Sequence, residues 1–100
     1  MTDHEAGAAE RITAAVESWP EVKVGPHRFG GVEFRLGRRE LGHLHRDRIS
    51  DIPFPRPVRD ELIAAGRALP HHVLPESGWV TFTIVEPQDV DRAIKLFRLS

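Results

Sequence analysis

The chain has no cysteine among its 100 residues. Disulfides, thiolate zinc sites, iron–sulfur clusters and cysteine nucleophiles are therefore excluded. The sequence also lacks an apolar run close to the roughly 20 residues that cross a bilayer. Its first ten residues are acidic and rich in alanine, instead of basic and then apolar, so they do not resemble a signal peptide. We therefore expect a cytoplasmic protein without membrane contact.

A basic excess is missing as well. The chain has 14 Lys and Arg against 15 Asp and Glu, a formal net charge of −1 at pH 7. Domains that bind a nucleic-acid backbone usually carry a clear positive excess, so nucleic acid is not the expected partner. Five arginines that lie close in sequence keep nucleic-acid binding as an alternative, although a solvated hairpin explains them more simply: Arg35, Arg38, Arg39, Arg46 and Arg48.

The length and composition favour one domain, which we assign to residues 1–100. Apolar residues make up 40% of the chain and charged residues 29%, a globular balance with a small core that a homodimer would enlarge. The order of the expected elements is α-β-β-β-α-β-α, with no glycine-rich phosphate loop. We therefore predict the α+β class, with three helices on one antiparallel sheet.

The N-terminal half predicts one helix and three strands. Ile12, Val16 and Trp19 recur at helical spacing, Thr2 or Asp3 can cap this helix, and Pro20 ends it. Alternating polar and apolar residues then predict strands at 21–24, 32–36 and 40–45.

A two-residue turn at Gly37 and Arg38 would join the last two of these strands into a hairpin. The resulting register pairs Leu36 with Arg39, Arg35 with Glu40, Phe34 with Leu41, Val32 with His43, and Gly30 with His45. Since side chains alternate between the faces of a strand, we expect both histidines on the apolar face with Phe34.

The C-terminal half predicts two helices and one strand. Residues 47–56 are expected to form a loop or a short edge segment, because their prolines do not suit a central strand. A helix would begin at Pro57, present an apolar stripe and end at Pro70, the stripe being Val58, Leu62, Ala65 and Leu69. Residues 79–85 predict a strand with Val80, Phe82 and Ile84 on one face. The last helix would open near Pro87 and bury Val90, Ile94 and Phe97.

His43 and His45 are the most informative polar pair, because residues two apart on a strand point the same way. Two imidazoles on one face can chelate a metal, bind an anion or exchange protons near neutral pH. A metal would need a third ligand, for which His71, His72 and Asp47 are the candidates. Partly buried, hydrogen-bonded histidines at the end of the sheet are the alternative explanation.

The segment 71–79 is the second candidate region. Gly78 before Trp79 allows close approach of backbone or ligand, and alternation places Trp79 on the face opposite Val80 and Phe82. We therefore predict His43, His45, His72 and Trp79 as ligand-binding residues. No catalytic residue and no metal ligand are assigned from the sequence, the cofactor is left unknown, and no serine lies in a Gly-x-Ser-x-Gly setting.

Four blocks of the sequence resemble those of a family of small bacterial proteins called the luciferase family, or luciferase-like domain. They are Gly42-His43-Leu44-His45, Ile52-Pro53-Phe54-Pro55, Val58-Arg59-Asp60-Glu61-Leu62 and the segment 71–80. The likeness spans about residues 20–100 and implies that His43, His45, His72, Gly78 and Trp79 belong to a shared pattern, without giving any of them a role. Nothing resembles the barrel of flavin-dependent luciferases or an adenylate-forming enzyme. A fainter likeness, in element order only, is to the double-wing proteins.

Three functional hypotheses follow from these patterns. The first is a ligand-binding or protein-interaction module whose pocket lies between residues 42–47 and 71–79, with a small molecule or a protein as its partner. The second is a metal-dependent enzyme that uses His43, His45 and either His71 or His72. The third is nucleic-acid binding through the arginine-rich hairpin 35–48.

Overall fold

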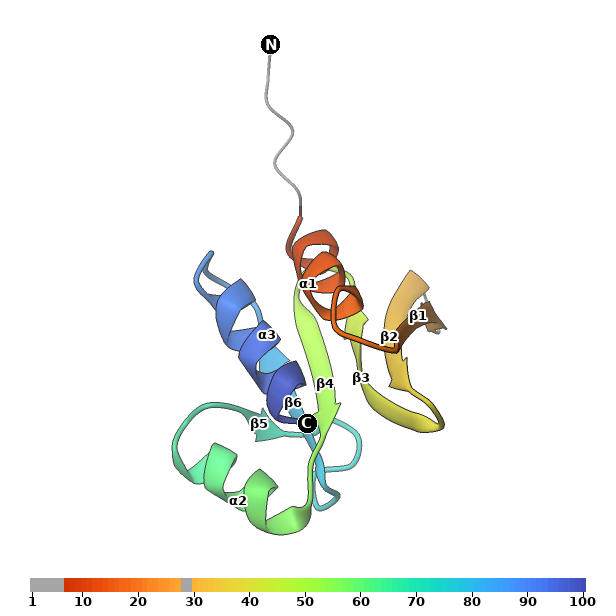
Figure 1. Cartoon of the computed structure of the whole chain (residues 1–100). Coiled ribbons are helices and arrows are strands. Elements are labelled where there is room, and N and C mark those ends of the chain that lie inside the picture. Colours follow the sequence, from red (N-terminus) through yellow and green to blue (C-terminus); the bar gives the residue numbers. More distant parts are fainter. Residues whose placement is uncertain (1–6, 28–29) are drawn as a thin grey trace.

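The computed structural model describes residues 7–27 and 30–100, which form three helices and one six-stranded antiparallel sheet (Figure 1). The elements, in chain order, are α1 (Ala8–Glu17), β1 (Val22–His27), β2 (Gly31–Leu36), β3 (Arg39–His45), β4 (Ile49–Pro53), α2 (Arg56–Ala64), β5 (Leu69–Pro70), β6 (Trp79–Thr83) and α3 (Asp89–Leu99). The strands lie in the order β1-β2-β3-β4-β6-β5. The predicted α+β class is confirmed, and the sheet has two strands, β4 and β5, that the predicted order lacks.

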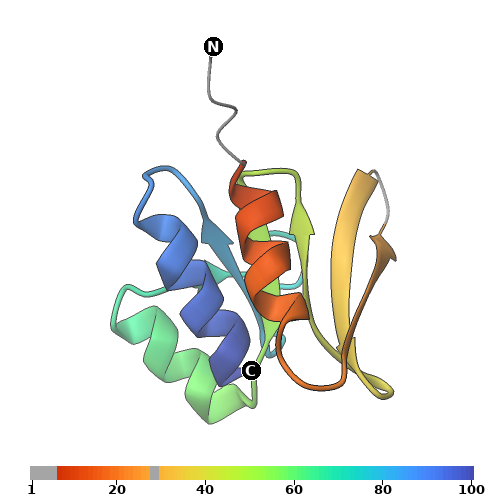
Figure 2. The same ribbon diagram turned by 45° about the horizontal axis from the view of Figure 1, so that its top comes forward.

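The three helices lie on one side of the sheet (Figure 2). Buried apolar side chains of the helices and strands form one core cluster. Phe34 of β2 meets Phe97 of α3 edge to face, with ring centroids 5.2 Å apart. Ile12 and Val16 of α1 are fully buried, as their helical spacing predicts. The proposed caps of α1, Thr2 and Asp3, lie outside the described residues.

The N-terminus of α1 is held by a side chain from far along the sequence. Asp47, in the turn between β3 and β4, accepts a 2.7 Å hydrogen bond from the backbone N–H of Ala9 through Oδ1. An acidic group at this position satisfies a free helical N–H and complements the helix dipole. The Asp47 carboxylate therefore serves as a cap of α1.

The prediction of a loop or short edge segment over residues 47–56 is wrong, because Ile49–Pro53 forms the strand β4 inside the sheet, between β3 and β6. Proline is excluded only where a strand must donate a backbone hydrogen bond. Pro53 is the last residue of β4, where it pairs with Trp79, and Pro55 lies beyond the strand. Residues 49–52 are thus free to pair on both sides.

The helix α2 also ends earlier than its apolar stripe suggests. Gly66 adopts a left-handed conformation with φ 73°, and the backbone N–H of Arg67 bonds the carbonyl of Leu62. This is the hydrogen-bond pattern by which glycine terminates a helix. Leu69, which we expected on the buried stripe, instead begins the edge strand β5 and is 61% exposed.

The hairpin between β2 and β3 begins in the predicted register and then shifts by one residue. Leu36 pairs with Arg39, and Arg35 with Glu40, as the two-residue turn requires. A bulge follows, after which Phe34 pairs with Gly42 and Glu33 with His43, so the predicted pairs of Phe34 with Leu41 and of Val32 with His43 are wrong. Val32 pairs instead with Leu44. Because one residue of slip moves every later side chain to the other face, His43 and His45 lie on the face away from Phe34 and the helices.

The start of α3 gives a testable pH dependence. The Asp89 carboxylate accepts hydrogen bonds from the backbone N–H groups of Val85 and Glu86, both 2.9 Å, and from Arg92 at 2.8 Å. These bonds, the backbone ones first, lower the pKa of Asp89 to about 2. The ionised carboxylate therefore stabilises the folded chain above the ordinary aspartate pKa of about 3.9, and this contribution is lost as the pH falls toward 2.

We expect Asp89→Asn to lower the urea midpoint at pH 7 and to reduce the further loss of stability between pH 4 and pH 2. Urea denaturation of both proteins at several pH values measures the two effects. If the urea midpoints of the two proteins differ as much at pH 2 as at pH 7, this role for the Asp89 charge is contradicted.

Candidate functional site: a histidine cluster around Asp51

One row of residues crosses the face of the sheet that the helices leave uncovered. The register aligns Glu33 of β2, His43 of β3, Asp51 of β4 and Thr81 of β6 as successive neighbours. Residues two positions along a strand point to the same side, so His45 lies on this face too. The segment 71–78 passes behind the sheet in Figure 2 and brings two further histidines to the row.

Asp51 is the centre of the cluster, and only 1% of its side chain is exposed. Its Oδ2 lies 3.2 Å from Nε2 of His43 and 3.2 Å from Nε2 of His45. The same oxygen is 3.3 Å from Nε2 of His72 and 3.6 Å from Nε2 of His71. Four imidazoles from two separate segments therefore face one carboxylate oxygen.

The other oxygen of this carboxylate has a separate partner. Thr81 donates its hydroxyl to Asp51 Oδ1 at 2.7 Å, and both side chains are buried. This bond fixes the plane of the carboxylate, so that Oδ2 alone faces the imidazoles.

Two of the imidazoles are held by carboxylates at their Nδ1 atoms. His43 Nδ1 lies 2.8 Å from Glu40 Oε2, and His27 Nδ1 lies 3.0 Å from Glu33 Oε1. His27 comes from the edge strand β1 and stacks on His43 with ring centroids 3.9 Å apart. A carboxylate at Nδ1 fixes the orientation of each ring, and in His43 it leaves Nε2 directed at Asp51.

Trp79 forms the aromatic wall of the cluster. Its ring lies 5.3 Å from that of His43 and 6.1 Å from that of His71, measured between centroids. Its position depends on Gly78, where a Cβ would lie 2.2 Å from the carbonyl oxygen of Phe54. The close backbone approach that we predicted at Gly78 is therefore confirmed, and it is Phe54 that approaches.

The model of one protein family, the Luciferase domain, matches residues 38–100, which is more than half of the chain. The chain belongs to the Luciferase domain family. No curated protein and no solved structure matches it. The matched segment of this Luciferase domain holds Asp51 and four of the clustered histidines, whereas His27 lies before it.

The charges in the cluster depend on burial and on the shared carboxylate. Burial opposes ionisation of Asp51, but hydrogen bonds from His43, Thr81 and His72 outweigh it, and the pKa of Asp51 is well below its usual range. Burial also opposes protonation of His43, but its bonds to Asp51 and Glu40 raise the pKa overall. This Luciferase domain therefore holds an ionised Asp51 beside a His43 that protonates readily.

The pKa values of His45 and His71 shift in the opposite direction from that of His43. Burial is the first cause that lowers the pKa of each imidazole. Repulsion adds to it, from His43 at His45 and chiefly from His72 at His71, and the attraction of Asp51 does not compensate. Neutral imidazoles near neutral pH are the form that binds metal ions.

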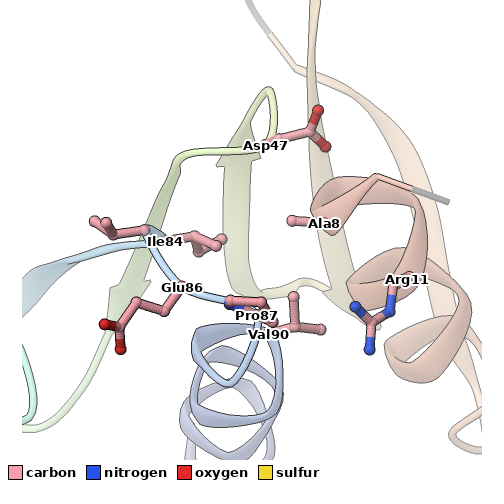
Figure 3. Close-up of a pocket in the computed structure, with 8 residues that line it drawn as sticks. Ala8, Arg11, Asp47, Ile84, Glu86, Pro87 and Val90 are labelled. Atoms are coloured by element: carbon pink, nitrogen blue, oxygen red, sulfur yellow. The ribbon is translucent and has the colours of Figure 1, made fainter. Parts of the chain in front are cut away.

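One surface hollow of the described chain lies away from the histidines. It has a volume of about 680 Å³, and Figure 3 shows Arg11 of α1, the capping Asp47 and Pro87 around it. A smaller hollow of about 370 Å³ adjoins the cluster, because two of its lining residues, Glu40 and Trp79, contact His43. Among the described helices, none combines the length and apolar character needed to cross a membrane.

The structure brings together the four residues that the sequence singled out, His43, His45, His72 and Trp79. It adds His71, one of the three candidates for a third metal ligand, whereas Asp47, another candidate, caps α1. Sequence reasoning missed the central residue, Asp51, because its strand was interpreted as a loop. The signal was present: Asp51 stands between Ile49 and Ile52 in a segment short enough for one strand.

Proposed function

We propose that this domain is a ligand-binding module that works through a metal ion. Asp51 Oδ2 and imidazole nitrogens from β3 and the segment 71–72 would hold a divalent first-row metal, with zinc as the reference ion. Trp79 and the hollow beside it would receive the organic part of a small molecule.

The observation that carries the proposal is the spacing of the polar atoms. Nε2 atoms of three histidines lie 3.2, 3.2 and 3.3 Å from Asp51 Oδ2. Zinc binds histidine nitrogen and carboxylate oxygen at about 2.0–2.2 Å in tetrahedral geometry, which separates neighbouring ligand atoms by about 3.3 Å. These three distances from Asp51 Oδ2 thus match the separation between neighbouring ligand atoms in a first coordination shell.

Hydrogen bonding alone explains the positions of the histidines around Asp51 less well than metal binding does. A carboxylate oxygen has two lone pairs, whereas four imidazole nitrogens lie within 3.6 Å of Oδ2. His43 shares Nδ1 with Glu40, so only its doubly protonated form can donate to both carboxylates, whereas a neutral His43 directs a lone pair at Asp51. A cation between these atoms removes that repulsion.

The surroundings of the cluster also suit a metal. Glu40 behind His43 and Thr81 behind Asp51 are outer partners of the kind that orient metal ligands. The side chain of His72 is 51% exposed and that of His45 is 28% exposed, so the ion would be open to solvent on one side. An ion with five or six ligands would keep an exchangeable position there.

Calorimetric titration of the untagged, chelator-treated chain with zinc tests the proposal. We expect one ion per chain and, in His45→Asn, an affinity reduced roughly tenfold or more, because one ligand is lost. His45 is partly exposed, so its replacement should leave the fold intact, as circular dichroism can check.

Asp60→Asn serves as the control, since Asp60 is 61% exposed and pairs with Arg59 on α2. Its affinity for zinc should equal that of the wild type. Absence of saturable zinc, iron, manganese, cobalt or nickel binding by the folded wild type would overturn the proposed function.

A further inference from the structure

We infer that His72, and not its neighbour His71, is the metal ligand from the segment 71–72, and that His71 donates Nε2–H to an anionic oxygen ligand on the ion. This inference rests on the proposed function and specifies the ligand class of the same site. The ligand class is a small carboxylate, bound by the metal through one oxygen and by His71 through a hydrogen bond.

The hydrogen bonds of His71 decide its protonation pattern. Its Nδ1 lies 3.1 Å from the backbone nitrogen of Val73 and 3.0 Å from that of Leu74. Backbone N–H groups are donors only, so Nδ1 must accept and cannot carry a hydrogen. Neutral His71 therefore carries its hydrogen on Nε2, the atom that faces Asp51.

An imidazole with a hydrogen on Nε2 has no lone pair there for a metal. For His71 to coordinate through Nε2, Nδ1 would have to take up the hydrogen and both backbone bonds would break. Those two bonds shape the turn that carries His72 and leads toward Trp79. Coordination of the metal by His71 would thus break the hydrogen bonds of the turn that positions the site.

The distances agree with this division of roles. His71 Nε2 is 3.6 Å from Asp51 Oδ2, beyond the ordinary hydrogen-bond range and longer than the three other imidazole distances. The His71 side chain is only 10% exposed, so its Nε2–H lies inside the cluster, where Asp51 is at best a weak acceptor for it. His72 Nε2, at 3.3 Å and on a half-exposed side chain, lies at the spacing of a ligand.

The donor and the cation together favour an anion. A carboxylate oxygen at the exchangeable position of the metal would accept the Nε2–H that Asp51 leaves largely unused. Trp79, whose ring is 6.1 Å from that of His71, would pack beside the carbon skeleton of such a ligand. A neutral ligand would coordinate the metal but would form a weaker hydrogen bond with His71.

Two substitutions of His71 separate its two nitrogens. His71→Asn places an amide oxygen near the position of Nδ1, which keeps an acceptor for Val73 and Leu74 and removes the distal donor. His71→Gln extends further and restores an N–H near the position of Nε2. His72→Asn is the matched change at the neighbouring residue.

The experiment uses the full chain loaded with cobalt(II), whose visible spectrum reports its ligands, titrated with acetate. We expect His71→Asn to bind cobalt within about threefold of the wild type and acetate roughly tenfold more weakly, since one charge-assisted hydrogen bond is lost. His71→Gln, which restores the distal N–H but gives up the acceptor for Val73 and Leu74, should bind acetate more tightly than His71→Asn and less tightly than the wild type. His72→Asn should lose cobalt affinity by roughly tenfold or more.

Two outcomes would overturn the inference while the proposed function stands. Loss of cobalt in His71→Asn with retention in His72→Asn would reverse the ligand assignment. Unchanged acetate affinity in a cobalt-loaded His71→Asn would remove the donor role. Failure of the folded wild type to bind cobalt or any other tested ion would instead contradict the metal site itself.

Discussion

Asp51→Asn should abolish tight metal binding, with zinc affinity reduced roughly a hundredfold or more. The imidazoles of His43, His45 and His72 all face this carboxylate, and its negative charge offsets the charge of the ion. Loss of an outer-shell partner alone typically costs ten- to a hundredfold in metal affinity, so loss of the central ligand should cost at least the upper value. Competition with a chromogenic chelator measures the change.

Asp47→Asn is the matched control for this substitution. It makes the same chemical change only four residues away, at a carboxylate that caps α1. Asparagine caps helices about as well as aspartate, so neither stability nor zinc affinity should change much. An Asp51→Asn protein that is folded and binds zinc as tightly as the wild type would refute the central role of Asp51.

Gly42→Ala should lower the free energy of unfolding by about 3 kcal/mol or more, because the added methyl group combines backbone strain with a steric clash. Gly42 lies at the bulge in β3 with φ 142°, where L-residues are strained. A Cβ there would lie 2.6 Å from the ring of Phe97 and 2.7 Å from the carbonyl oxygen of Asp51. Both neighbours are fixed in the core or in β4.

Urea denaturation tests this prediction, with Gly25→Ala as the control. Gly25 is also in a strand, but a Cβ at that position would meet nothing within 4 Å. We expect the control to stay within about 1 kcal/mol of the wild type. A Gly42→Ala protein as stable as Gly25→Ala would show that the bulge tolerates a side chain, against the packing described here.

Periodicity predicted the helices and the outer part of the sheet, because those elements bury one face and expose the other. Ile12 and Val16 in α1, and Val90 and Phe97 in α3, are all buried as their spacing indicates. The class and the three helices could therefore be predicted from local patterns alone.

The bulge in β3 could not be predicted in this way. Alternation assigned His43 to the apolar face because the register was counted outward from the turn at Gly37, and one extra residue reverses that assignment. The bulge depends on contacts between Gly42, Phe97 and β4, which are distant in sequence. Local alternation contains no information on such contacts.

The centre of the site was missed for a related reason. Prolines near the end of β4 suggested a loop, so Asp51 was never placed on a strand beside His43. The sequence did identify the histidines and Trp79, since histidines two apart on a strand and a Gly-Trp pair are visible without any tertiary contact. Which of them meet, and around which carboxylate, depends on pairings between β3, β4 and β6.

X-ray diffraction from crystals of the untagged chain grown with zinc, recorded at the zinc absorption edge, tests the metal site most directly. We expect one strong anomalous peak, about 2 Å from Asp51 Oδ2 and from the Nε2 atoms of His43, His45 and His72. A cluster without such a peak in crystals of the folded protein, or zinc bound only elsewhere on the surface, would contradict it.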